Sequence, residues 1–444
     1  MLVNMNPLKN FFDDLKHIKE PLPRFRVAQL LFIWCLTFAW FKEGFMRITA
    51  GLALLLMWKT MPIPHFSLER KDFSRTTWFI VLAFFVWIFT IPLMFGATTL
   101  TQELRSFLKP LETLIFILFS LFFFRGEDFE ERFTFWAVVG LCAFIFSCAV
   151  NRYINNFADA RGLDTFLNFT PMAAIQYISM WLGCLVCYLF KKKSNLLIRI
   201  LALIAILIAP GLALISYYRG AILACVATLL FALFFAFLLI RQSVLVKLSL
   251  VLLIILLFLG VATTLLLSFA DKCSVPFDVW QGRLGLTSAR ISQTNLFEGL
   301  STGRWSAWRQ EVDKIRVRPL AGYGLGLSFK SFNIRSDLSR ALHYDEVITH
   351  PHNTMLQVAI HTGVPGLVLF LLSQLVLFIL AISKTVASKH QTLYFTFAIM
   401  VVAKFFSGLT EGFFMPARYF LVPFWCLAFY VMFNESQTNA PESV

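Results

Sequence analysis

The sequence predicts an all-α polytopic membrane protein that crosses the bilayer about twelve times and carries one long loop on the non-cytoplasmic side. The chain of 444 residues is 58% hydrophobic and only 14% charged, and its mean hydropathy is +0.73. A soluble domain is about one quarter charged, so most of this surface must face something other than water. The apolar residues also come in runs of about twenty, the length that a helix needs to span the hydrocarbon core.

Spanning helices are predicted wherever an apolar run is long enough. Their approximate bounds are 23–41, 44–61, 77–96, 104–124, 133–151, 170–190, 196–215, 219–240, 244–269, 355–380, 392–409 and 417–433. The runs 196–215 and 219–240 are so close that a tight hairpin is expected. The first residues are polar and lack the apolar stretch of a cleavable signal, so the first spanning helix is expected to direct insertion.

The orientation follows from Lys and Arg, which are enriched in short cytoplasmic loops. With the N-terminus inside, the inner loops hold Lys59, Arg70, Lys71, Arg75, Lys191, Lys192, Lys193, Arg241, Lys247, Lys384 and Lys389. Both termini are therefore expected in the cytoplasm. The predicted parts are a transmembrane bundle of about nine helices (1–269), an outer loop with catalytic motifs (270–354), C-terminal spans (355–433) and a cytoplasmic tail (434–444).

The excess of basic residues and the cysteines are both explained by a membrane protein. A net charge of +14 would suggest nucleic acid in a soluble protein, but here many basic residues lie between apolar runs, where they set topology. Of the eight cysteines only Cys273 lies in the long loop, so no disulfide framework is expected. The pair Cys184 and Cys187 lies in an apolar run and is interpreted as packing residues rather than a redox or zinc site.

The long outer loop contains an amphipathic helix and a glycine-rich turn. Trp305, Trp308, Val312 and Ile315 lie three or four residues apart within 303–318, which predicts a helix at the interface with its aromatic face toward the membrane. Pro319 ends that helix. The sequence Gly-Tyr-Gly-Leu-Gly at 322–326 then predicts a turn.

Several outer-face arginines are candidates for binding an anion. Arg219 lies at the outer end of a predicted span, and its planar fork suits phosphate oxygens, although such an arginine can also simply anchor a helix end. Arg304 and Arg309 belong to a basic cluster that could hold a diphosphate or attract anionic lipid headgroups. Arg418 could join a phosphate clamp or pair with Glu411.

The sequence His350-Pro351-His352-Asn353 stands just before a predicted span. Asn353 or Thr354 is suited to cap that helix, and a histidine at its start can take a proton from a hydroxyl nucleophile. Three interpretations are open: a general base, a helix cap, and a zinc site formed with His343 and His361. The spacings expected of zinc ligands are absent, and the base interpretation is preferred.

The order of these motifs resembles that of the O-antigen ligase and O-antigen polymerase superfamily. The resemblance rests on Tyr-Arg-Gly-Ala at 218–221, Gly-Arg-Trp at 303–305, Arg-Pro-Leu-Ala-Gly-Tyr-Gly-Leu-Gly at 318–326, and His-Pro-His-Asn-Thr-Met-Leu-Gln with Gly-Val-Pro-Gly at 350–366. It extends from about residue 216 to residue 419. One departure is Tyr218, where many members have Ser or Thr.

The resemblance implies a bacterial inner-membrane glycosyltransferase with a periplasmic active site and no cofactor or metal. Its donor would be an undecaprenyl-diphosphate-linked glycan and its acceptor a sugar of lipid A-core. It assigns Arg219 and Arg304 to the diphosphate and His352 to the base role. Arg309, Arg418, Tyr323, His350 and Asn353 are the expected further substrate contacts.

Three other functions stay open at this point. A polymerase of the same superfamily would extend another lipid-linked glycan, and a protein O-oligosaccharyltransferase would use a Ser or Thr acceptor. A transporter of lipid-linked glycan belongs to a different class and predicts charged residues buried in mid-membrane. The charges singled out above all lie at the outer edge, which favours the transferases.

Overall fold

The computed structural model describes residues 13–18, 20–38, 43–57, 72–95, 100–124, 128–154, 171–190, 195–215, 219–239, 304–324, 353–387, 391–409 and 422–433, with residues 248, 251, 252 and 255. These residues form helices and the short turns beside them, and no strand occurs among them. The predicted all-α class is therefore confirmed for this part of the chain.

The described helices fall into an N-terminal set, one helix from the long loop, and a C-terminal set. The N-terminal set is α2 (Pro21–Thr37), α3 (Glu43–Met57), α4 (Asp72–Phe95), α5 (Leu100–Phe123), α6 (Phe129–Ile154), α7 (Pro171–Phe190), α8 (Leu196–Ile215) and α9 (Arg219–Leu239). Helix α14 (Arg304–Val317) belongs to the loop. The C-terminal set is α16 (Thr354–Ala387), α17 (Gln391–Gly408) and α18 (Val422–Phe433).

These helices follow the predicted apolar runs closely. The bounds of α8 are those of the predicted run 196–215, and α14 matches the predicted interfacial helix within a residue or two. Within the described part of the chain, three helical stretches are long and apolar enough to cross a membrane, namely Phe129–Val150, Leu196–Ala213 and Thr354–Ala387. The run 244–269 lies almost wholly outside the described residues, so a total of about twelve spans stays a prediction.

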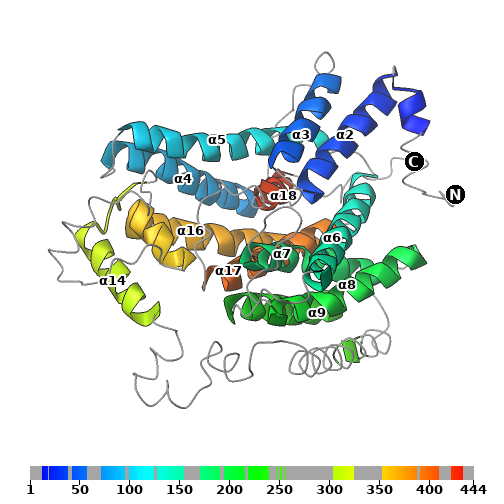
Figure 1. Ribbon diagram of the computed structural model, residues 1–444. Coiled ribbons are helices and arrows are strands. Elements are labelled where there is room, and N and C mark those ends of the chain that lie inside the picture. Colours follow the sequence, from blue (N-terminus) through cyan, green and yellow to red (C-terminus); the bar gives the residue numbers. More distant parts are fainter. Residues whose placement is uncertain are drawn as a thin grey trace.

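Helices α7 and α17 form the centre of the bundle, where they pack against each other and against α9 (Figure 1). From Ala174 to Phe190 every residue of α7 is buried, and α17 is buried from Leu393 to Lys404. A helix that is apolar all round belongs inside a bundle. Trp181 and Phe397 are among its largest buried side chains.

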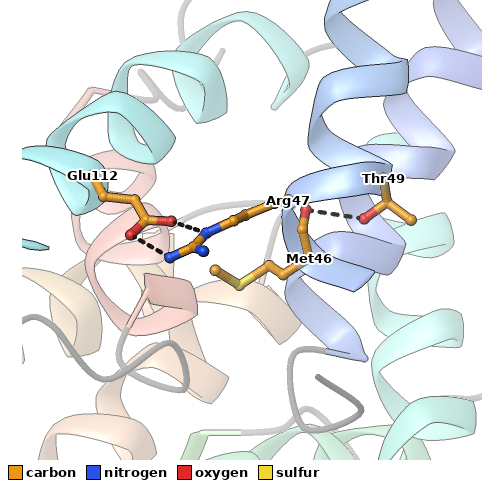
Figure 2. Close-up of polar contacts among 4 residues, drawn as sticks. All are labelled: Met46, Arg47, Thr49 and Glu112. Atoms are coloured by element: carbon orange, nitrogen blue, oxygen red, sulfur yellow. Dashed lines mark hydrogen bonds and ion pairs between the residues drawn. The ribbon is translucent and has the colours of Figure 1, made fainter. Parts of the chain in front are cut away.

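A charged pair connects two helices at the edge of the bundle. The Arg47 Nε on α3 donates to Glu112 Oε1 on α5 at 2.8 Å, and the second guanidinium nitrogen donates to Oε2 at 3.1 Å (Figure 2). The side chains are 57% and 35% exposed, so this two-point contact lies on the outside of the helix pack. Arginine suits it because its fork matches both carboxylate oxygens.

Helix α16 is broken near its beginning. Gly363 has φ 75° and ψ 178°, which is not helical, and Pro365 follows two residues later. The ribbon of α16 bends at the end that lies beside α14 (Figure 1). A break of this kind frees backbone carbonyls, because proline has no N–H and the turn before it loses its helical hydrogen bonds. The partners of these carbonyls define the candidate site.

Candidate functional site

The glycine-rich turn after α14 pairs with the broken segment of α16. Tyr323 N donates to Ile360 O at 2.7 Å, and Gly324 N donates to His361 O at 3.0 Å. In the opposite direction, Val364 N donates to Pro319 O at 2.7 Å. Two sequence motifs that lie about forty residues apart are thus joined through their backbones.

The freed carbonyls of α16 all have partners. In a regular helix, Ile360 O and Thr362 O would accept from the N–H groups of Val364 and Gly366, whereas His361 O would face Pro365, which has no N–H. Here the turn supplies two of the three donors, and the third carbonyl, Thr362 O, accepts from Trp87 Nε1 of α4 at 2.9 Å. The His361 ring adds a further bond, since its Nδ1 lies 2.7 Å from Gly324 O. The α14 turn, α4 and α16 therefore meet at one junction.

Two glycines make this close approach possible. Gly322 has φ 66°, and an added Cβ would lie 2.5 Å from Ile360 O. Gly363 has φ 75°, and its Cβ would collide with Leu320 O. A side chain at either position would be strained by the backbone angle and blocked by a carbonyl. The backbone angles and the close carbonyls therefore explain why glycine stands at positions 322 and 363.

Asn353 caps the helix that follows the histidine motif. Its Oδ1 accepts from Met355 N at 2.9 Å and from Leu356 N at 3.1 Å, which confirms the predicted cap. Its Nδ2 also donates to Leu409 O at 3.2 Å, just after α17 ends. Because this residue directly follows His352, the cap ties the chain at the histidine motif to the end of α17.

Helix α14 contains a buried ion pair. Glu311 is fully buried and accepts from Lys314 Nζ at 2.7 Å, whereas Val312 is 36% exposed. Trp308 and Ile315 are half-buried. The orientation of the face with Trp305, Trp308, Val312 and Ile315 toward the membrane stays a prediction. The spacing of apolar residues does not predict the buried, ion-paired Glu311.

Tyr323 anchors the turn to α14. Its side chain is buried, and its hydroxyl donates to Lys314 O at 3.1 Å. Burial raises the pKa of the Tyr323 phenol above its ordinary value, and the nearby Arg318 guanidinium offsets part of that rise. The phenol therefore stays protonated at neutral pH and keeps its role as a donor.

The two arginines of the predicted catalytic set occupy helix beginnings. Arg219 is the first residue of α9 and Arg304 is the first residue of α14. Their backbones are described, but their side chains are not. Arg309 lies on α14 with an exposed side chain. The predictions for His350, His352 and Arg418 fall outside the described residues. No group of metal-binding side chains occurs within the described ranges.

Lys404 is a candidate that the sequence analysis missed. It is only 6% exposed and lies in α17, inside the predicted span 392–409. Its Nζ lies 4.3 Å from the ring centre of Phe424, 4.7 Å from that of Trp425 and 5.0 Å from that of Phe370. The available signal was a single lysine in an otherwise apolar run. Lys404 is thus a charged side chain buried among helices.

The apolar helices and the interlock of the α14 turn with α16 define a multi-helical membrane protein, in which a histidine motif precedes a broken helix. Residues 203–371 match the family model described as O-antigen ligase. The match supports membership of the chain in the O-antigen ligase superfamily and an enzymatic activity in general, as the resemblance predicted. The matched residues include α9, α14, the glycine-rich turn and the break in α16. No curated protein matches the chain.

Proposed function

We propose that the protein transfers a glycan from undecaprenyl diphosphate to a sugar hydroxyl of lipid A-core. In this proposal the protein resides in the bacterial inner membrane with both termini in the cytoplasm and the active site in the periplasm. The match to the O-antigen ligase family supports lipid-linked glycans as the substrate class. Lipid-soluble donor and acceptor explain why the site would lie where helices end at the membrane surface.

The reaction breaks one bond and forms one. His352 takes the proton of the acceptor hydroxyl, and the oxygen attacks the anomeric carbon of the donor sugar from the face opposite the diphosphate. The bond from that carbon to the diphosphate oxygen breaks, and undecaprenyl diphosphate leaves with the electron pair. The anomeric configuration is therefore inverted. A positioned base contributes about 10²- to 10⁴-fold to such a step.

Arg219 and Arg304 stabilise the charge that develops on the leaving diphosphate. Fixed cations in a partly dry site act strongly on developing charge. Each arginine begins a helix, and the partial positive charge of a helix N-terminus adds to its own. Two guanidinium groups can supply this stabilisation without a metal ion.

The observation that carries the proposal is the interlock between the α14 turn and the break in α16. These hydrogen bonds fix the helix that begins with Arg304 against the helix that follows His352. Cations for a leaving group and a base for an acceptor must be held at a constant separation. A backbone interlock can do this, because it does not depend on mobile side chains.

The test is a transfer assay with the purified full chain, an undecaprenyl-diphosphate-linked glycan and lipid A-core. The wild type should label lipid A-core, and His352→Ala should lose at least about 100-fold in rate while folding normally. Growth of the lipid-linked glycan without any labelled lipid A-core would indicate a polymerase instead. A labelled Ser or Thr peptide would indicate a protein acceptor. Transport of the intact donor without glycan transfer would refute the proposed enzymatic function.

A further inference from the structure

Lys404 has a buried ammonium group surrounded by aromatic rings. The rings of Phe370, Phe424 and Trp425 come from α16 and α18, and all three centres lie within 5.0 Å of Nζ. Phe84 and Phe85 of α4 pack against the same rings from behind. The box is therefore held by three helices around a lysine from a fourth.

The described surroundings of this lysine contain no negative charge. Among the residues that the structure describes, no carboxylate lies within ion-pair distance of Nζ, and its contacts are the three rings. Aromatic faces attract a cation but carry no net charge, so they offset only part of the cost of burying it. An ammonium in such a place favours a bound anion.

The box lies close to the start of α16. Gly408, one helical turn or about 6 Å along α17 from Lys404, packs against Thr354, and an added Cβ on this glycine would lie 3.1 Å from the threonine side chain. On a straight α16, Thr354 and Phe370 would lie about 24 Å apart. The break at Gly363 lies between them, so both halves of α16 can approach the same end of α17.

We propose that Lys404 is a third cation of the active site and binds the phosphate of a lipid-linked substrate from within the membrane. The inference rests on the proposed function, because that function supplies the ligand class. Lysine binds phosphate as a point charge, and the three rings next to the ammonium group fix where that charge lies. The donor diphosphate is the expected ligand, and lipid A also carries phosphate.

The competing role is a purely structural clamp that joins α16, α17 and α18. Lys384 is the natural comparison, because it also lies over a ring, that of Tyr394 at 5.6 Å. Its Nζ in addition donates to Val431 O at 2.6 Å, at the end of α18. Lys384 thus has the partner expected of a structural lysine, and it serves as the control.

The experiment measures binding and thermal stability for the full chain in nanodiscs. The probes are glycan-free undecaprenyl diphosphate, lipid A, and phosphatidylglycerol as a plain anionic lipid. Lys404→Met should weaken undecaprenyl diphosphate binding at least about tenfold, and Lys404→Arg should keep most of the affinity. Lys384→Met should lower the melting temperature and leave the affinity unchanged. If Lys404→Met loses about tenfold in affinity for lipid A alone, Lys404 still binds phosphate, but the phosphate is that of the acceptor.

Three results would overturn the inference. One is unchanged affinity of Lys404→Met for both substrate lipids. Another is an equal loss for phosphatidylglycerol, which would mean general attraction of anionic lipid. The third is rescue of a destabilised Lys404→Met by Glu411→Gln, which would show that the lysine pairs with that carboxylate. If the wild type binds neither substrate lipid, the proposed function itself fails, so the two failures are distinguishable.

Discussion

In the centre of the bundle, α7 and α17 bury large side chains on every side, whereas the junction of α14 and α16 is held by a few backbone hydrogen bonds. The centre can lose one contact and keep its arrangement, since many others remain. The junction has one donor for each carbonyl that the break at Gly363 sets free. The comparison teaches that packing sets the stability of this protein, while a small number of directional bonds set the geometry of its candidate site.

The largest effect on stability is expected from the centre. Phe397 is fully buried and its ring lies 5.2 Å from that of Phe424. Phe397→Ala should lower the free energy of unfolding by about 3–5 kcal/mol, because it leaves a cavity. Phe79→Ala is the control, since that ring is 64% exposed. Thermal unfolding in detergent measures both, and equal losses would refute the distinction between centre and edge.

The largest effect on activity without loss of stability is expected at Arg304. Arg304→Ala should lower the transfer rate about 10²- to 10³-fold, because it removes a cation that faces the developing charge. Arg304→Lys should recover only part of the rate. Arg316→Ala, which removes an exposed arginine of the same helix, should have little effect. If both alanine variants lose activity equally, the cluster acts only through its general charge.

A smaller combined effect is expected from the glycine of the interlock. Gly322→Ala should cost about 1–3 kcal/mol, because alanine is strained at this φ and would meet Ile360 O. The variant should lose transfer activity as well as stability. Gly51→Ala in α3 has open space around its Cβ and should be neutral or slightly stabilising. A fully active Gly322→Ala would mean that the turn need not pair closely with α16.

The smallest effect is expected at the helix cap. Asn353→Ala should cost about 0.5–2 kcal/mol and reduce transfer, since the cap holds the chain next to His352. Asn195 Oδ1 accepts from Leu197 N at 2.9 Å at the start of α8, away from the junction. Asn195→Ala should therefore change stability without changing the rate per folded molecule. Transfer assays normalised to folded protein separate the two variants.

The two regions also differ in how far the sequence predicts them. Apolar runs of about twenty residues predicted the positions of most helices, because the bilayer fixes the length of a span. The run 196–215 has the same bounds as α8. The cap at Asn353 was predicted from local hydrogen-bonding chemistry. These features depend on neighbours in the chain, which a single sequence displays directly.

The remaining features depend on contacts between distant segments. The apolar run 355–380 predicts one continuous helix, although Gly363 and Pro365 break it. The pairing of the turn with that break needs a register that no local pattern contains. The burial of Glu311 and the aromatic box around Lys404 likewise arise from helices that are remote in sequence. Charged residues in buried positions were missed for this reason.

The central claim is that Arg219, Arg304 and His352 gather around one diphosphate. A structure of the full chain with bound undecaprenyl diphosphate tests it most directly. Both guanidinium groups are expected within about 3 Å of phosphate oxygens, with the His352 ring on the opposite side of the position that the donor sugar would occupy. A diphosphate bound away from either arginine, or a His352 ring facing a separate region, would contradict the claim.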